Sequence, residues 1–344
     1  MLRVGLIGYG LAGQAFHAPN IRTVPGMELA CIMERSGSLA QQRYPNVRVV
    51  RTIDELLADK GIQLCVVATP NTSHFDVGKQ CLLAGRDVVI DKPFAPTLAE
   101  AEELVRLGKE NKRLLTVFHN RRLDGDFLTV KKLVDSGVLG RIAEYEVRYD
   151  RFRPEPKLSV WREQAKPGSG VMFDLSPHLI DQALTLFGQP KSITASAFQQ
   201  REGIVVDDAF DICLQYPGLR VMLRGRVLAY APGPHFLLHG TKGTFMKWGM
   251  DPQEDRLRNG EEPAGDDWGE EAESQWGTLS LADGSPPKKI KTERGDYRQF
   301  YAMMRDAIVH NVPLEITPQQ SLATMRVIEL AYQSSREGKT VSWE

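Results

Sequence analysis

The sequence is poor in cysteine and lacks any long hydrophobic segment. Its 344 residues include four cysteines, with no CxxC pair among them. Cys31 and Cys65 lie in apolar segments, where a free thiol packs as a small hydrophobic group. No apolar segment approaches the ~18 residues of a membrane span, and a predicted strand, RVGLIG, stands where a signal peptide would begin. We therefore expect a cytoplasmic protein with reduced cysteines.

An excess of charge is also absent. The net charge is −1, with 42% hydrophobic and 25% charged residues, as is typical of soluble globular proteins. The basic segments RFRPEPK and PKKIK are short and more typical of solvated surface than of a phosphate-binding patch. We therefore expect neither nucleic acid nor a membrane as a partner. No histidine or cysteine spacing indicates a metal site.

Short apolar segments alternate with helical patterns in residues 1–120, which predicts βαβ units and a doubly wound parallel sheet. The first helix is expected over residues 11–24. The predicted strands cover residues 3–8, 27–33, 47–50, 63–69, 87–91 and 113–119.

From residue 121 to 344 the pattern changes to long strands in succession, which predicts an α+β domain with a large mixed or antiparallel sheet. Helices are expected over residues 126–136, 294–310 and 317–336, and residues 168–188 are expected to be a glycine-rich entry followed by an apolar helix. The strands are expected over residues 141–153, 192–199, 208–216, 219–230 and 235–240.

Two features of this second domain suggest contacts beyond a simple core. The long strands would leave Val221, Leu223 and Val227 exposed on a broad sheet face, so we expect a homodimer or homotetramer. Residues 250–295 are rich in glycine, proline and acidic residues and include Trp268. They are either a surface excursion whose tryptophans pack back on the body, or a flap or subunit contact.

A glycine-rich turn follows the first predicted strand. It matches GxGxxG immediately after a strand and at the start of a helix, which indicates a dinucleotide-binding turn. Glu34 ends the second strand about 20 residues later, where an acid binds the adenosine ribose hydroxyls and favours NAD. Arg35 beside it leaves NADP open. The turn consists of Gly8, Tyr9, Gly10, Leu11, Ala12 and Gly13.

Polar residues stand where the fourth and fifth strands end. ATPNTSH covers residues 68–74 and IDKPF covers residues 90–94. Open α/β sheets bind ligands beyond the carboxyl ends of their strands, so both segments lie on the rim that carries the glycine turn. Lys92, which ends an apolar strand and precedes a proline, is therefore predicted to be functional.

The helix expected within residues 168–188 places polar residues along one narrow stripe. Asp174, His178, Asp181 and Thr185 fall together at 100° per residue. One interpretation is a polar face turned toward water. The other is an acid–base pair, because the spacing of four residues lets Asp174 orient the His178 imidazole. The pattern alone leaves both open.

Three segments together carry a resemblance to a known family. GLIGYGLAG, ATPNTSHFDVGKQCLLAGRDVVIDKPF and GSGVMFDLSPHLIDQAL resemble the Gfo/Idh/MocA family of NAD(P)-dependent sugar and polyol dehydrogenases, over essentially the whole chain. Asp91 stands where the family usually has Glu. FHNRRLDGDFLTVKKL, RYDRFRPE, VWRE and the GMDPQED…DDWG segment are similar to the scyllo-inositol dehydrogenase group. The resemblance implies a Rossmann domain followed by a substrate-binding domain.

The resemblance also implies roles for particular residues. Lys92 matches the lysine that hydrogen-bonds the reacting hydroxyl, and Asp174 and His178 match the catalytic pair, with His178 as general base. His119, Arg151 and Arg153 are predicted to contact substrate because they lie near these motifs. The positions that match the lining of the cofactor or the cleft are Thr69, Pro70, Asn71, His74, Asp91, Asn120, Trp161 and Arg162.

These roles imply hydride transfer between a secondary alcohol of a sugar or polyol and NAD, which we expect in preference to NADP. Two other functions remain open: a non-catalytic NAD(P)-binding sensor, and a reductase of a different carbonyl substrate. The first would not need Lys92, Asp174 and His178 together, and the second would be expected to alter the Asp174–His178 pair.

Overall fold

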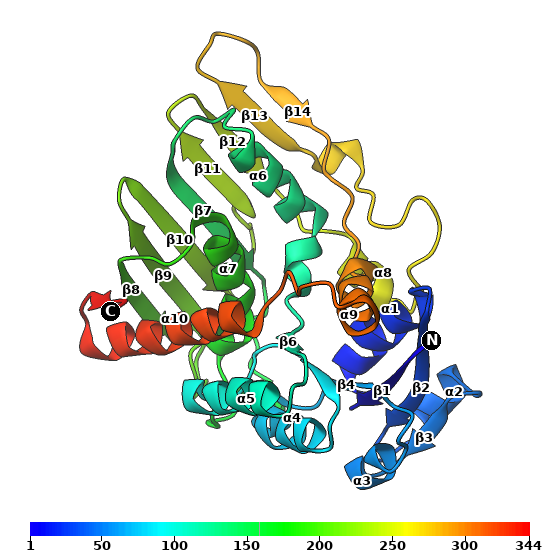
Figure 1. Cartoon of the computed structure of the whole chain (residues 1–344). Helices are drawn as coiled ribbons and strands as arrows, with labels where there is room; N and C mark the ends of the chain where they lie inside the picture. Colours follow the sequence, from blue (N-terminus) through cyan, green and yellow to red (C-terminus); the bar gives the residue numbers. More distant parts are fainter. Residues whose placement is uncertain (158) are drawn as a thin grey trace. The chain divides into compact units, whose positions relative to one another are not determined.

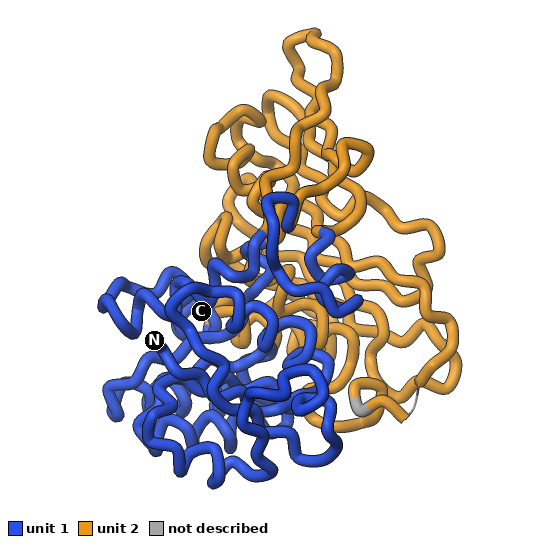
Figure 2. Tube along the Cα trace, turned by 90° about the vertical axis from the view of Figure 1, so that its right-hand side faces the viewer, with its two compact units in different colours: residues 1–123, 252–268, 296–322 blue, residues 124–251, 269–295, 323–344 orange. Residues whose placement is uncertain are grey.

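The computed structural model describes residues 1–157 and 159–344. The chain forms two compact units (Figure 2). Each unit has its own sheet. The sequence predicted that residues 121–344 form one domain. In the structure the chain returns twice to the first unit, with residues 252–268 and 296–322. Unit 1 comprises residues 1–123, 252–268 and 296–322, and unit 2 comprises residues 124–251, 269–295 and 323–344.

Unit 1 contains a parallel sheet of six strands in the order β3-β2-β1-β4-β5-β6 (Figure 1). Segments such as LCVV and DVVI are buried along their whole length, as expected of strands in a parallel sheet. The doubly wound sheet predicted from the sequence is confirmed. The strands are β1 (Leu2–Ile7), β2 (Met27–Met33), β3 (Arg48–Val50), β4 (Leu64–Val67), β5 (Asp87–Ile90) and β6 (Leu115–Val117).

Two helices of unit 1 begin at side-chain caps. The hydroxyls of Thr52 and Thr97 each accept a hydrogen bond at 3.2 Å from the backbone N–H three residues later. The helix expected over residues 11–24 is present over residues 11–23, with a π-helical turn inside it, because Pro19 has no N–H to continue the regular ladder. The elements are η1 (Gly13–His17), α1 (Ala18–Thr23), α2 (Leu39–Arg43), α3 (Ile53–Leu57), η2 (Asn71–Ser73), α4 (His74–Leu83), α5 (Leu98–Glu110) and η3 (Asn120–Leu123).

Later segments of the chain complete the core of unit 1. Trp268 is fully buried and packs with Leu257 of α8 (Gln253–Arg258) and with Tyr297. α9 (Arg298–His310) adds Phe300, Tyr301 and Met304 to the largest apolar cluster of the unit. Residues 250–295 are therefore not one structureless loop. Trp268 packs back on the body of the protein, as the first of the two interpretations predicted.

Unit 2 is built on a sheet of nine strands in the order β14-β13-β12-β11-β7-β10-β9-β8-β15 (Figure 1). β7 and β10 pair in parallel, and the other neighbours pair antiparallel, so the predicted mixed sheet is confirmed. The strands are β7 (Ile142–Asp150), β8 (Ser192–Phe198), β9 (Ala209–Tyr216), β10 (Leu219–Arg226), β11 (Phe236–Gly240), β12 (Gly243–Lys247), β13 (Gly277–Leu281), β14 (Lys288–Ile290) and β15 (Val341–Ser342).

The apolar face of this sheet is covered within the chain. α7 (Val171–Phe187) packs on β7, β9 and β10, and Val221, Leu223 and Val227 are 0%, 0% and 4% exposed. The prediction that these three side chains would be exposed without a second subunit is therefore wrong. The remaining elements of the second half are α6 (Gly125–Asp135), η4 (Trp161–Glu163), η5 (Glu273–Gln275) and α10 (Pro318–Glu337).

All four cysteines are free and buried, as expected from their apolar settings. Within the described residues, every helix is too short or too polar to cross a membrane. The same part of the chain holds no cluster of metal-ligating side chains.

Candidate active site

The glycine turn after β1 has the shape of a cradle for a phosphate. Gly8 has φ +102°, and a Cβ there would lie 2.6 Å from the carbonyl oxygen of Ala68. A Cβ on Gly13 would lie 2.3 Å from the carbonyl oxygen of Gly8, whereas a Cβ on Gly10 would have no atom within 4 Å. Gly8 and Gly13 are thus required by the packing of the protein itself. Gly10 instead leaves open space beside backbone N–H groups, which fits a dinucleotide pyrophosphate.

The other residues of this turn support it in different ways. Tyr9 is buried and packs edge-on against Tyr44, with ring centroids 6.4 Å apart, and burial raises the pKa of Tyr9 to about 12. The Tyr9 carbonyl accepts a hydrogen bond from Gln14 at 2.8 Å. Leu11 is 54% exposed, and Ala12 packs at the edge of the apolar core. Tyr9 therefore anchors the turn, while Leu11 remains on its surface.

Replacing Gly10 with valine is expected to separate cofactor binding from stability. The new side chain enters open space, so we expect the melting temperature to stay close to that of wild type. The same side chain occupies the predicted pyrophosphate site, so we expect the Kd for NADH, measured by quenching of tryptophan fluorescence, to rise at least about 100-fold. Gly13→Ala is the contrasting variant and should lower the melting temperature. A Gly10→Val protein that binds NADH normally would refute the cradle.

Glu34 follows β2 and has a fixed carboxylate. It is 6% exposed and accepts hydrogen bonds from the backbone N–H groups of Leu39 and Ala40, at 3.0 and 3.3 Å. These are first-turn groups of α2, which an acidic side chain satisfies. Arg35 is exposed beside it. The end of β2 thus carries a negative charge held in place by backbone, next to a solvent-exposed guanidinium.

His74 connects the ends of β4 and β5. It is buried, and its Nδ1 and Nε2 atoms lie 2.8 Å from the carbonyl oxygen of Pro93 and 2.9 Å from that of Thr69. Carbonyl oxygens only accept, so both contacts are hydrogen bonds when both ring nitrogens carry protons. Burial lowers the pKa of His74, and Asp91 and the two carbonyls oppose that shift. His74 therefore links the predicted Thr69–His74 segment to the one that carries Lys92.

The rest of this predicted segment lies on short helical turns. Asn71 is 3% exposed and begins η2, which Pro70 precedes. The Ser73 hydroxyl donates to Thr69 Oγ1 at 2.8 Å. These contacts hold the segment at the carboxyl end of β4, where the sequence predicted it.

Lys92 follows β5 and is half-buried. Its backbone N–H donates to Asp91 Oδ1 at 2.9 Å. The same carboxylate oxygen lies 3.8 Å from Nε2 of the fully buried His17. Asp91 is therefore held between the Lys92 backbone and a histidine that belongs to the helix of the glycine turn.

The protonation of His17 follows from its surroundings. Its Nδ1 contacts the hydroxyl of Tyr301, whose pKa burial raises well above its ordinary value. Burial lowers the pKa of His17 to about 4. The neutral imidazole thus accepts a hydrogen bond from Tyr301 at Nδ1 and carries its proton on Nε2, which faces Asp91. No pattern in the sequence indicated this support behind Lys92.

The buried state of His17 predicts a pH-dependent stability. Between pH 6.5 and about 4 the unfolded chain binds a proton at His17 that the folded chain does not, so acid favours unfolding. Over this window we expect wild type to lose about 3 kcal/mol of unfolding free energy relative to His17→Gln. Urea unfolding of both proteins at a series of pH values measures this difference. A difference that does not change with pH would show that His17 protonates in the folded protein.

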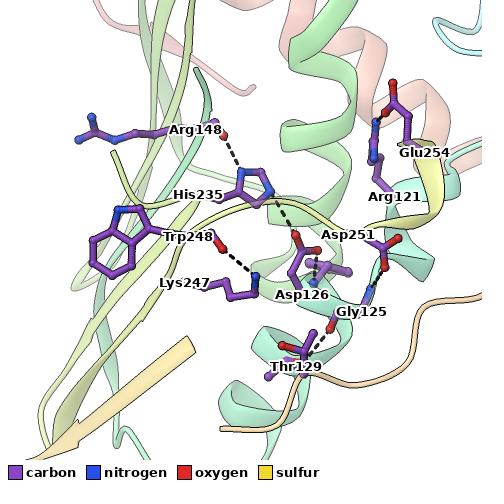
Figure 3. A network of polar contacts seen from close by, with 12 residues as sticks. Arg121, Gly125, Asp126, Thr129, Arg148, His235, Lys247, Trp248, Asp251 and Glu254 are labelled. Carbon is purple, nitrogen blue, oxygen red and sulfur yellow. Dashed lines mark hydrogen bonds and ion pairs between the residues drawn. The ribbon is translucent and has the colours of Figure 1, made fainter. Parts of the chain in front are cut away.

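The end of β6 supplies further buried polar residues to unit 1. His119 and Asn120 are 3% and 5% exposed, and both were predicted to line the site. Arg121, which was not predicted, is also buried and forms an ion pair with Glu254 of α8 (Figure 3). Its Nη1 donates to the Tyr297 hydroxyl at 3.3 Å. This ion pair ties α8 to the segment that carries His119.

α7 in unit 2 begins at a site that sequence patterns did not reveal. Asp207 accepts hydrogen bonds from the backbone N–H of Met172 at 2.6 Å and from the Tyr332 hydroxyl at 3.0 Å. A Cβ on Gly170, which has φ +96°, would lie 2.3 Å from this carboxylate. Asp207 therefore caps the first turn of α7 from a distant part of the chain, and Gly170 lets it approach.

Two of the four residues in the polar stripe of α7 are buried. His178 and Asp181 are 6% and 2% exposed, so the interpretation of a solvated polar face is wrong for these residues. Asp174 Oδ1 accepts a hydrogen bond from Arg162 Nε at 3.2 Å. The His178 ring centroid lies 6.2 Å from that of Tyr149 on β7. Unit 2 thus brings together Arg162, Asp174 and His178 with an aromatic residue that the sequence analysis missed.

The remaining predicted residues of unit 2 lie near the same strand. The Arg151 guanidinium lies 5.7 Å from the Tyr149 ring centroid, whereas Arg153 is exposed and its backbone N–H donates to the Val227 carbonyl at 2.7 Å. Trp161 begins η4, and its side chain lies outside the described part of the structure. The Arg151 side chain therefore lies near Tyr149, whereas Arg153 is held through its backbone hydrogen bond to Val227.

The parallel sheet with its glycine turn, the fixed acid after β2 and the buried histidine on α7 define an NAD(P)-dependent oxidoreductase. Residues 2–119 match the family model described as "Oxidoreductase family, NAD-binding Rossmann fold", and residues 131–343 match its "C-terminal alpha/beta domain". The chain belongs to the Gfo/Idh/MocA family.

Comparisons with individual proteins agree with this assignment. The chain is 44% identical to the uncharacterized oxidoreductase YdgJ of Escherichia coli, covering 99% of this chain and 98% of YdgJ. It is 37% identical to the scyllo-inositol 2-dehydrogenase (NADP(+)) IolW of Bacillus subtilis, covering 100% and 96%. The solved structure of the oxidoreductase YvaA from Bacillus subtilis superposes with a TM-score of 0.96 at 37% identity, covering 100% and 98%.

Proposed function

We propose that the protein oxidises a secondary alcohol of an inositol-like polyol or sugar with a nicotinamide cofactor. The observation that carries the proposal is the buried His178 on α7, packed beside Tyr149 and one turn from the Arg162–Asp174 ion pair. A buried imidazole among polar and aromatic groups is suited to take a proton from a hydroxyl. The similarity to IolW supports a polyol as the substrate class.

In this proposal each residue has a distinct role. His178 takes the proton of the reacting hydroxyl, and Asp174 contributes the negative charge that favours the imidazolium then formed. The Lys92 ammonium stabilises the negative charge that develops on the substrate oxygen. When bound, the nicotinamide cofactor supplies the acceptor of the hydride. The glycine turn after β1 and the segment held by His74 would hold that cofactor.

We further propose that NAD is preferred to NADP. The Glu34 carboxylate is fixed by two backbone N–H groups, so its charge stays where a ribose 2′-phosphate would have to bind. Bringing like charges together costs several kcal/mol when nothing relieves it. The relative IolW is named for NADP(+), and the exposed Arg35 is the residue through which this chain would accept that cofactor instead.

The experiment is a screen of polyols and aldoses with each cofactor, followed by the near-ultraviolet absorbance of reduced nicotinamide. We expect turnover with inositol isomers and with NAD. Cofactor binding without turnover on any alcohol or carbonyl substrate would contradict the proposed activity and favour a sensor.

We also propose that the protein is a homodimer or homotetramer joined through unit 2. The side chains of β10 that alternate with the buried ones project away from α7, and they include Arg224 and Arg226. Arg224 lies 3.6 Å from both Glu146 and Asp211, and Arg226 lies 2.7 Å from Asp211. A face with both signs of charge can pair with its own copy about a two-fold axis. Light scattering should give a multiple of 38.5 kDa; a mass of one chain at all micromolar concentrations would exclude this.

A further inference from the structure

A series of rings in unit 2 leads from His178 to a buried carboxylate. The Tyr149 ring centroid lies 6.2 Å from that of His178 and 5.6 Å from that of His235. His235 is 5% exposed and directly precedes β11. Its Nε2 lies 3.7 Å from Oδ2 of Asp126, which is in the first turn of α6. Tyr149 therefore contacts both His178 and a histidine that is paired with a buried aspartate.

One nitrogen of His235 has a fixed role. Nδ1 lies 2.6 Å from the carbonyl oxygen of Arg148, which only accepts, so Nδ1 carries a proton. Figure 3 shows the ring between this carbonyl on one side and the Asp126 carboxylate on the other. Any second proton on His235 is therefore on Nε2 and faces Asp126.

Asp126 requires a proton nearby for a separate reason. Its side chain is fully buried, and Oδ1 accepts a hydrogen bond from the Phe127 N–H at 2.7 Å. Oδ2 has no hydrogen-bond partner among the described residues. A buried carboxylate oxygen without a partner costs several kcal/mol when charged. The cost is avoided when Oδ2 is protonated or when the imidazole beside it is a cation, and both arrangements place one proton in the pair.

The surrounding charges favour retention of that proton. Asp251, which accepts a hydrogen bond from the Gly125 N–H at 2.7 Å, adds a like charge close to Asp126. Lys247 opposes it, but its ammonium is paired with Glu271 at 2.6 Å. Burial, followed by the charge of Asp251, raises the pKa of Asp126 to about 7. Tyr145 is a further titratable neighbour, and burial raises its pKa well above the ordinary value.

We propose that Asp126 and His235 share a single proton and thereby hold the His235 ring against Tyr149, which in turn positions His178. They are positioning residues for the general base, and this role rests on the proposed dehydrogenase function. Loss of the shared proton at alkaline pH would leave a carboxylate facing an imidazole lone pair. The pair would then separate, and Tyr149 would lose its contact with a fixed His235 ring.

The shared proton is tested without activity by nitrogen NMR of protein labelled at histidine. Comparison with His235→Gln assigns the His235 signals among the seven histidines. We expect Nδ1 to remain protonated at every pH, whereas the Nε2 signal should change as the pH is raised. Asp126→Asn should abolish this change. Asp251→Asn should lower the pH at which it occurs, because this variant removes a like charge. A His235 that titrates identically in wild type and both variants would overturn the proposal, whatever the protein catalyses.

The positioning role is tested by the pH dependence of kcat. The side-chain amide that Asp126→Asn introduces can donate to a neutral Nε2, so we expect kcat close to that of wild type at neutral pH. This variant should also lack the fall in kcat at alkaline pH that we attribute to loss of the shared proton. Asp126→Leu removes that donor and should lower kcat about 10- to 100-fold with KM for NAD unchanged. If Asp126→Leu does not fold, the pH dependence of kcat in Asp126→Asn and Asp251→Asn still tests the positioning role. Equal alkaline limbs in wild type and Asp126→Asn would refute the role.

Discussion

Replacing His178 with alanine is expected to lower kcat by about 10²–10⁴-fold, the effect of removing a general base. The imidazole is buried on α7 beside Tyr149, and no other described histidine lies on that helix. KM for the cofactor should change little, because the glycine turn that we propose binds it belongs to unit 1. Steady-state kinetics with the best polyol from the screen, at several pH values, measure the effect.

A matched control for this variant is His239→Ala. His239 is exposed on β11 and contacts Thr244 Oγ1 at 2.9 Å, so its loss should leave kcat unchanged. Added imidazole should restore part of the activity of His178→Ala but not alter that of the control. A His178→Ala enzyme with normal turnover would show that another group takes the proton.

Replacing Glu34 with serine is expected to change the ratio of kcat/KM for NAD to that for NADP by about 100-fold in favour of NADP. The fixed carboxylate is removed, and like-charge repulsion of a few kcal/mol is lost with it. Arg35 then becomes available to pair with the 2′-phosphate. The ratio, measured for wild type and variant under the same conditions, gives the effect directly.

Glu34→Gln separates charge from shape in this comparison. Its amide oxygen can still accept from Leu39 or Ala40, which Glu34 now caps, but the negative charge is gone. We expect it to relax the discrimination in the same direction as Glu34→Ser. A wild-type enzyme that already prefers NADP would contradict the role of Glu34. It would indicate that Arg35, and not Glu34, recognises the adenosine ribose of the cofactor.

The fold was predictable wherever local pattern and burial agree. Segments such as LCVV and DVVI are apolar throughout and bounded by polar turns, so they read as strands of a parallel sheet. The glycine turn was predictable because a strand precedes it and a helix follows. The position of Lys92 after an apolar strand was predictable, and the structure places it just after β5; its role in catalysis stays a prediction.

The features that the sequence did not reveal depend on contacts between distant residues. Asp207 caps α7 from a position 35 residues away, and no local motif marks it. Tyr149 and His235 come together because β7 and β11 are neighbours in the sheet, which strand patterns alone do not specify. The error about Val221 had the same origin, since alternation shows that one face of β10 is apolar but not that α7 covers it.

The measurement that most directly tests the proposed activity is isotope transfer from the alcohol carbon. An inositol deuterated at every ring carbon is oxidised with NAD, and the reduced cofactor is isolated and analysed by mass spectrometry and NMR. We predict one deuterium per reduced cofactor, on one face of nicotinamide C4, in wild type and, at a much lower rate, in His178→Ala. Reduced cofactor that forms without deuterium, or no reduction with any polyol, would contradict the account.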